Sequence, residues 1–319
     1  MASNQGMTPA SNMQKHGHGG KFTAQEMRTH EGLLIAFNTI LVAGLLLNLI
    51  ILSVACLSRK VQRTATWMLF IVSWIVLCLS YLALAGQQMG QNSMPAFGFC
   101  LAQAALMYAA PPLTAYATLI FMIQVYLSLR CYVYGEKPKE KYITGLLAIP
   151  PIIHAAIVIE VVILGLRDRN QVKRHMTGMF CSLNKTMTPI YVTLALVTVA
   201  VIGVIGLEIT TALFLRRNWS AFMSMNKKEK EASFFGPGIV IRMALFSIVP
   251  IFVLIIELII IPLHSNKMGM SVSLIMYAIV PLLAALAFGT QGDIIGALMF
   301  WKKDPISVVT RGDKEKDIA

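Results

Sequence analysis

Seven long apolar segments constrain what this chain can fold into. A segment of roughly 20 mostly apolar residues is long enough to cross the hydrocarbon core of a bilayer as one helix. The segments have no alternation of polar and apolar residues, which a membrane β-barrel would require, so we expect helices. The sequence therefore predicts an all-α membrane protein, a seven-transmembrane helix bundle within residues 33–300. The predicted spans cover about 33–57, 67–87, 98–128, 143–165, 189–215, 240–263 and 270–291.

The composition agrees with a membrane protein and excludes several other classes. Hydrophobic residues make up 56% of the 319 residues and charged residues only 13%, against about a quarter charged residues in ordinary globular proteins. A soluble domain, a disordered chain and a nucleic-acid-binding protein are all excluded by these values. The formal net charge of +12 is therefore interpreted from the distribution of basic residues across a membrane, and not as a sign of nucleic-acid binding.

The basic residues are unevenly divided between the two sides that seven spans would create. The side that holds the N-terminus carries 9 of the 27 lysines and arginines, and the other side carries 18. Because basic residues accumulate in cytoplasmic loops, we expect an extracellular N-terminus and a cytosolic C-terminus in a multi-pass plasma-membrane protein. One loop departs from this bias, since five basic residues follow the fourth span on the predicted outer side.

The two ends of the chain are polar. Residues 1–32 are predicted to form an extracellular disordered tail with no cleaved signal sequence, and residues 301–319 a cytosolic disordered tail. Between the last span and that second tail, residues 293–303 place apolar side chains on one face and end in Trp301 and two lysines. This pattern predicts a short amphipathic helix that lies on the membrane lipid after helix seven.

The topology isolates two of the five cysteines on the oxidising side. Only Cys100, at the start of the third span, and Cys181, in the following outer loop, face the exterior, so we expect them to pair. Two unpaired cysteines are the alternative. The bond would enclose about 80 residues and contribute about 4.5 kcal/mol by the loop-entropy model. Asn184, in the sequon Asn-Lys-Thr of the same loop, is a predicted glycosylation site.

Together these features resemble a G-protein-coupled receptor. Asn48, in Gly-Leu-Leu-Leu-Asn-Leu, matches the single asparagine of the first helix in rhodopsin-type receptors, and Pro250 lies where such receptors kink helix six. The Phe288-Gly289 step at the end of helix seven is similar to that of fungal pheromone receptors. The resemblance implies an extracellular ligand, a heterotrimeric G protein as partner, and outward motion of helix six about Pro250.

The sequence also departs from the pattern of that family. The acidic-arginine-aromatic triplet at the end of helix three is reduced to the arginine of Leu129-Arg130-Cys131. Helix two has no aspartate, and Pro281 of helix seven has neither the asparagine before it nor the tyrosine after it. These departures indicate a divergent lineage.

Candidate ligand-binding residues are polar groups within the outer half of the bundle. Glu257 lies about 8 Å below the outer end of helix six, and it is either a polar partner for a ligand or a carboxyl group bound to a neighbouring helix. The proline pairs 111–112 and 150–151 predict kinks in helices three and four, which would open a cavity between them. The predicted lining residues are Gln103, Tyr108, Thr114, Tyr116 and His154.

Candidate switch residues lie toward the cytosolic side. Glu208 on helix five is predicted to form a resting-state latch with Arg130 or Arg242, although a locally solvated glutamate is the alternative. The basic loop before helix six would contact a G-protein α-subunit. Positive-inside topology and attraction to anionic lipid explain the same charges.

Other functions are less consistent with the sequence. A seven-span transporter of a small solute is the main alternative, but its two halves should repeat, and the proline pair of helix three is matched only by Pro281. A retinal protein requires a lysine in residues 270–291, which has none. A zinc hydrolase requires several intramembrane histidines, whereas His154 stands alone. We therefore expect a receptor with no enzymatic activity, cofactor or metal, and the sequence does not identify its ligand.

Overall fold

A computed structural model describes residues 24–58, 63–88, 95–135, 140–175, 177–184, 186–220, 255, 267–290 and 294–296. Five described helices are long and apolar enough to cross a membrane, within Glu31–Leu57, Ala65–Leu82, Phe97–Cys131, Thr144–Arg167 and Thr188–Arg217. This confirms that the first five predicted spans are apolar helices. The seventh predicted span is also helical, and its apolar part is Ser273–Gly289. The sixth predicted span lies outside the described residues, apart from residue 255.

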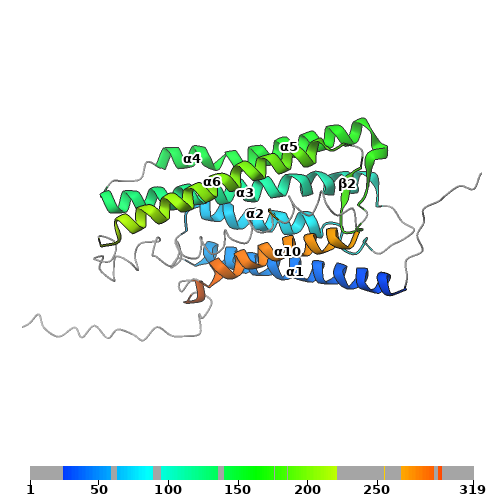
Figure 1. Ribbon diagram of the computed structural model, residues 1–319, viewed down its shortest axis with the longest axis horizontal. Coiled ribbons are helices and arrows are strands. Elements are labelled where there is room, and N and C mark those ends of the chain that lie inside the picture. The colour runs from blue at the N-terminus through cyan, green and yellow to red at the C-terminus, as the bar shows by residue number, and fades with distance from the viewer. Residues whose placement is uncertain are drawn as a thin grey trace, which may run out of the picture.

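The long helices lie side by side along one common axis (Figure 1). They are α1 (Ala24–Leu57), α2 (Ala65–Leu82), α3 (Phe97–Tyr134), α5 (Ile149–Arg167), α6 (Thr188–Arg217) and α10 (Lys267–Gly289). Helix α3 packs against α2, α5 and α6, whereas α1 packs against α2 and α10. Helix α3 is therefore the central element of the described bundle, and α2 connects it to the α1–α10 pair.

The structure differs from the prediction in two details of the first and fourth spans. Helix α1 begins at Ala24, so residues 24–32 are its first turns and not part of a disordered tail. The fourth span is two helices, α4 (Glu140–Leu147) and α5. Its two prolines lie in the first turn of α5. The N–H groups of that turn have no intrahelical acceptor, so proline costs no hydrogen bond there. They begin a helix near one end of the bundle and do not kink a helix in its outer half.

The loop between α5 and α6 contains a β-hairpin, which the all-α prediction omitted. A short 3-10 turn, η1 (Arg169–Gln171), leads into β1 (Val172–Arg174), which pairs antiparallel with β2 (Cys181–Leu183). Three-residue strands carry too few residues for a pattern of alternation to be visible in the sequence. We call this end of the bundle the hairpin end. The other end, where α1, α3 and α6 terminate, is the opposite end.

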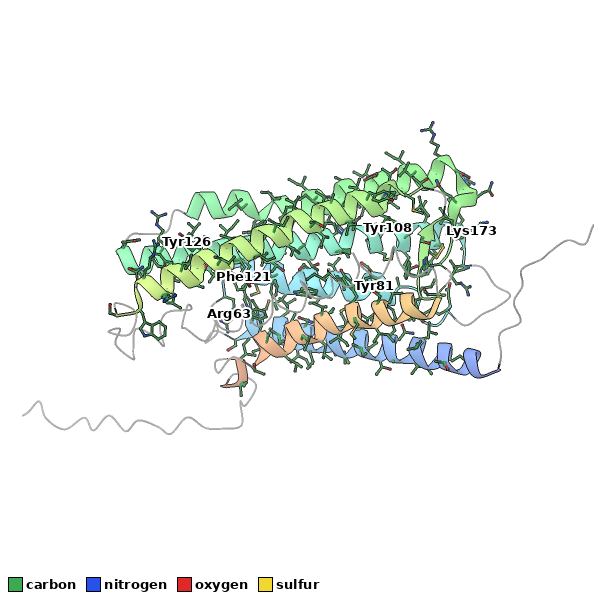
Figure 2. The ribbon with its side chains drawn as sticks, in the orientation of Figure 1. Arg63, Tyr81, Tyr108, Phe121, Tyr126 and Lys173 are labelled. Atoms are coloured by element: carbon green, nitrogen blue, oxygen red, sulfur yellow. A yellow bond between two sulfur atoms is a disulfide. The ribbon has the colours of Figure 1, made fainter. Side chains whose placement is uncertain are left out.

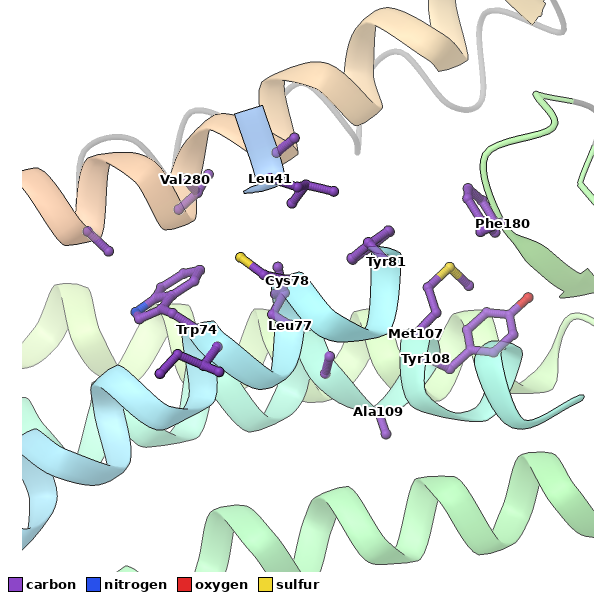
Figure 3. Close-up of a cluster of buried hydrophobic side chains, with 14 of the residues drawn as sticks. Leu41, Trp74, Leu77, Cys78, Tyr81, Met107, Tyr108, Ala109, Phe180 and Val280 are labelled. Atoms are coloured by element: carbon purple, nitrogen blue, oxygen red, sulfur yellow. The ribbon is translucent and has the colours of Figure 1, made fainter. Parts of the chain in front are cut away.

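An aromatic cluster fills the centre of the bundle. Phe70 of α2 lies with its ring centroid 4.9 Å from that of Phe288 in α10 and 5.4 Å from that of Phe121 in α3. All three side chains are fully buried. Toward the hairpin end the buried face of α2 continues with Trp74, Cys78 and Tyr81 (Figure 3). These side chains join helices from distant parts of the sequence into one core.

Candidate functional site

The hairpin is attached to α3 by two adjacent links. Cys100 and Cys181 form the predicted disulfide, with their Cα atoms 5.4 Å apart. One turn along α3, the Oε1 atom of Gln103 accepts a hydrogen bond of 2.8 Å from the backbone N–H of Cys181. The Gln103 side chain is only 1% exposed. A covalent bond and a buried hydrogen bond therefore hold β2 against the start of α3.

A polar network attaches the hairpin to α1 and to the turn that follows α2. The side-chain amide of Asn38 in α1 donates to Gln88 Oε1 at 2.5 Å. Gln88 Nε2 donates to the carbonyl of Met179 at 3.1 Å, and Arg174 Nη1 donates to the carbonyl of Gln88 at 3.3 Å. The sequence did not predict this network. Asn38 is nevertheless a polar residue within a predicted span, which is the signal that could have revealed it.

An aromatic chain continues from the hairpin into the bundle. The rings of His175 and Phe180 are stacked, with centroids 4.6 Å apart and planes 12° from parallel. Phe180 meets Tyr81 edge to face at 6.4 Å, and Figure 3 shows that it lies on the hairpin side of Tyr81. Tyr81 contacts Phe37 of α1 at 6.0 Å and Tyr277 of α10 at 5.7 Å. Phe180 of the hairpin therefore contacts the aromatic core of the bundle through the ring of Tyr81.

His175 is held by its neighbour in the hairpin turn. Its Nδ1 lies 3.0 Å from Thr177 Oγ1, and the Thr177 N–H donates to the same nitrogen at 3.4 Å. Thr177 is fully buried and His175 is half-buried. Burial disfavours the charged imidazolium and therefore lowers the pKa of His175 below its usual value.

The predicted proline pair lies inside the continuous helix α3. Pro112 has no N–H, so the carbonyl of Tyr108, four residues earlier, loses its usual helical partner. Thr193 of α6 replaces it, because its hydroxyl donates to that carbonyl at 3.0 Å. Within α3, the hydroxyl of Thr114 donates to the carbonyl of Pro111 at 2.8 Å. The Thr193 hydroxyl thus satisfies a backbone carbonyl that Pro112 leaves without its helical donor, as an apolar environment could not.

The predicted lining residues do not form one cluster. Gln103, Tyr108 and Thr114 are buried in α3, and the structure uses Gln103 and Thr114 in the internal hydrogen bonds given above. Tyr116 and His154 are half-buried, and within the described part of the chain neither makes a hydrogen bond or a ring contact. Glu257 lies outside the described residues. Gln103 reaches the hairpin through its bond to Cys181. Figure 2 shows Tyr108 toward the same end of the bundle, where Lys173 also lies.

The predicted switch residues are divided between described and undescribed parts of the chain. Arg130 is exposed at the opposite end, and its guanidinium carbon lies 6.0 Å from the ring centroid of Tyr134. Glu208 of α6 is half-buried. Pro250 and Arg242 lie outside the described residues, so the latch and the pivot stay predictions.

Contacts at the opposite end join α3 to α6 and to α2. Phe214 of α6 lies between two tyrosines of α3, with centroid distances of 6.1 Å to Tyr126 and 5.9 Å to Tyr134. The Thr66 hydroxyl of α2 donates to Gln124 Oε1 of α3. None of these contacts was predicted from the sequence. The aromatic residues are common in any membrane helix, so only the tertiary structure distinguishes them.

Asn184 is exposed, as a glycosylation site requires. The hydroxyl of its sequon threonine, Thr186, donates to Gln171 Oε1 at 2.6 Å. Of the other cysteines, Cys56 is exposed, Cys131 is half-buried and Cys78 is buried, and all three are free.

A comparison of this chain with models of known protein families finds no match, and a comparison with curated proteins finds none either.

Proposed function

We propose that this protein is a cell-surface receptor of the G-protein-coupled class, with seven spans, an extracellular N-terminus and a cytosolic C-terminus. One observation carries the proposal: a hairpin between two membrane helices is fixed by the Cys100–Cys181 disulfide to the start of α3. A disulfide forms on the oxidising side of a membrane, which supports placing the hairpin end outside. In this arrangement the ligand reaches the bundle beside the hairpin, and Asn184 carries a glycan.

The α1–α10 contact supports the same class. Asn48, the residue that resembles the first-helix asparagine of rhodopsin-type receptors, donates a hydrogen bond to the carbonyl of Pro281 in α10. Its side chain is fully buried. A buried amide that joins α1 to α10 fixes the register of these two helices. The signalling motion would then be a movement of helix six about Pro250.

The proposed partner is a heterotrimeric G protein at the opposite end. Arg130 is exposed there, on the turn of α3 that carries Tyr134. The ligand must bind the open state more tightly than the closed state. The difference between the two binding free energies sets how far the ligand shifts the equilibrium toward the open state. The basic residues of the loop before helix six would then meet the G-protein α-subunit, alongside anionic lipid.

Recruitment and transport can be compared in the same cells. We expect cells that express the full chain to recruit a G-protein α-subunit above the level of untransfected cells, and Pro250→Ala to lower that recruitment. Uptake of radiolabelled metabolites is measured in parallel. Uptake without recruitment would favour the alternative, a transporter of a small solute.

The topology has its own test. A tag at the N-terminus is expected to bind antibody on intact cells, whereas a tag at the C-terminus is expected to bind it only after permeabilisation. Two tags accessible on intact cells would contradict an odd number of spans and with it the receptor.

A further inference from the structure

The turn of the hairpin contains a histidine that makes one hydrogen bond available only to its uncharged form. The Thr177 N–H donates to His175 Nδ1, so this nitrogen is a hydrogen-bond acceptor. In the imidazolium both ring nitrogens carry protons, and Nδ1 cannot accept. Because Thr177 is fully buried, its N–H would then have no acceptor unless the turn opened to water.

The same turn is closed by backbone hydrogen bonds. The N–H of His175 donates to the carbonyl of Phe180, and the N–H of Gly178 donates to the carbonyl of His175, both at 2.8 Å. Gly178 has a φ of +71°, a conformation that glycine adopts without strain. Backbone hydrogen bonds and the bond from the Thr177 N–H to the imidazole therefore keep the turn closed together.

The charged surroundings of His175 disfavour a further positive charge. The ionisable side chains on β1, directly before His175, are Lys173 and Arg174, both cationic. On neighbouring elements, Asp168 precedes η1 and accepts a hydrogen bond from the Asn170 N–H. Tyrosines and disulfide-bonded cysteines on α2, α3, α10 and β2 are uncharged near neutral pH. Within the described residues no carboxylate pairs with His175.

The histidine is linked to the interior by the aromatic chain. Its ring stacks on Phe180, and Phe180 packs against Tyr81, which contacts α1 and α10. The disulfide follows directly at Cys181. Opening the turn would therefore withdraw Phe180 from Tyr81 while β2 stayed attached to α3.

We infer that the hairpin is a proton-responsive lid, in which protonation of His175 releases Phe180 from Tyr81 and exposes the hairpin end of the bundle. Protons are thus a regulatory ligand of this protein. The inference goes beyond the proposed function and does not depend on it, since a lid could regulate a receptor or a transporter.

The sign of the pH effect follows from burial. Burial lowers the pKa of His175 in the closed hairpin, so the open, hydrated hairpin binds the proton more tightly. The closed state is fully favoured above the usual histidine pKa of about 6.5 and loses stability as the pH falls below that value toward the lowered pKa. Acidification therefore opens the lid.

Hydrogen exchange of the purified full-length protein in lipid nanodiscs tests the inference. Protection of a peptide covering residues 172–184 is measured at about pH 7.5 and about pH 5.5, each corrected for the intrinsic exchange rate at that pH. We expect protection to fall by about fivefold or more at the lower pH. Peptides from the centre of α3 are expected to keep their protection.

Two variants separate titration from loss of structure. His175→Asn keeps an acceptor oxygen near the position of Nδ1, whereas His175→Phe keeps the stacking on Phe180. Neither side chain titrates, so both are expected to give the same protection at the two pH values. His30→Asn, at the start of α1, removes another histidine and is expected to keep the wild-type response.

Three results would overturn the inference: equal protection of the wild-type hairpin at both pH values, an undiminished pH response in both His175 variants, or loss of the response in His30→Asn.

Discussion

Asn48 of α1 donates a hydrogen bond of 3.1 Å to the carbonyl of Pro281 in α10, a residue 233 positions later in the chain. The same amide donates to the carbonyl of Gly44 at 2.8 Å. Gly44 makes the contact possible, because a Cβ atom at that position would lie 3.2 Å from the backbone nitrogen of Leu282. A glycine and an asparagine one turn apart thus set how closely the first and last described long helices approach.

Asn48→Leu is expected to destabilise the protein. The substitution removes both donors and leaves the carbonyl of Pro281 without its side-chain partner, which we expect to cost about 1 kcal/mol. The thermal midpoint of the detergent-solubilised protein would fall by several degrees. Ser53→Ala is the control, since Ser53 is on the same helix and makes only an exposed bond within it. An equal effect of both substitutions would contradict a specific role for Asn48.

Thr193→Val tests how α6 compensates for the proline pair. Valine has a similar shape but no hydroxyl, so the carbonyl of Tyr108 loses its donor at a cost of about 0.5–1.5 kcal/mol. In a Pro112→Ala background the alanine N–H can serve the same carbonyl, and Thr193→Val should then cost measurably less. A double-mutant cycle of thermal midpoints gives the coupling energy. Thr198→Val is the control, because that hydroxyl bonds only within its own helix. Strict additivity would refute the compensation.

Cys100→Ser is expected to detach the hairpin from α3. The disulfide closes a sequence separation of 81 residues, and its loss would cost up to about 4.5 kcal/mol by the chain-entropy model. Non-reducing peptide mapping and hydrogen exchange of residues 172–184 measure the result. The double variant Cys100→Ser/Cys181→Ser should match the single one, because only one bond is lost. Cys56→Ser is the control, since Cys56 is exposed and free.

Gly165→Ala is expected to separate α5 from α3. A Cβ atom at residue 165 would lie 2.3 Å from Leu101 Cδ1 and 3.2 Å from Val172 Cγ2. Overpacking of this kind costs about 1–3 kcal/mol. In a Leu101→Ala background, where the added methyl group finds room, Gly165→Ala is expected to cost less than in the wild-type protein. Gly145→Ala, where nothing lies within 4 Å, is expected to leave the melting temperature unchanged or to raise it slightly. A neutral Gly165→Ala would show that the Leu101 side chain moves aside without separating the helices.

Glu208→Gln tests the proposed latch. Removing the charge is expected to raise basal G-protein activation several-fold, because the resting state would lose its ion pair. The measurement is ligand-free recruitment, normalised to surface expression. Glu160→Gln is the control, since Glu160 is also half-buried in a membrane helix but lies on α5. Unchanged basal activity with normal surface expression would exclude the latch.

Much of the helical framework could be predicted from the sequence. The apolar segments are longer than any other local pattern and their length is set by the bilayer, so five spans were located to within a few residues at most of their ends. The proline pair of the fourth span was interpreted as a kink, whereas it begins α5 directly after a break at residue 148. The sequence does not distinguish a proline pair that kinks a helix from one that begins it. The first turns of α1 were missed because their residues are polar, and apolarity was the criterion for a span.

The candidate site was predicted unevenly. The pairing of Cys100 with Cys181 followed from topology alone, because charge bias left only two thiols on one side. Gln103 and Tyr108 were placed correctly in the third helix, yet the sequence could not show that Gln103 bonds to the backbone of Cys181. Hydrogen bonds between residues far apart in the chain depend on the rotation of each helix about its axis, and helices apolar on all sides carry no signal for that rotation.

The sequence by itself determined that the chain forms apolar helices long enough to cross a membrane and which two cysteines join. Both follow from length, composition and charge, which are properties of segments. Only the tertiary structure decided that a hairpin caps the bundle, that His175 stacks on Phe180, which packs against Tyr81, and that Asn48 reaches Pro281. Those features are contacts between single atoms of distant residues, and a buried polar atom finds its partner only when helix packing has brought the two within hydrogen-bonding distance.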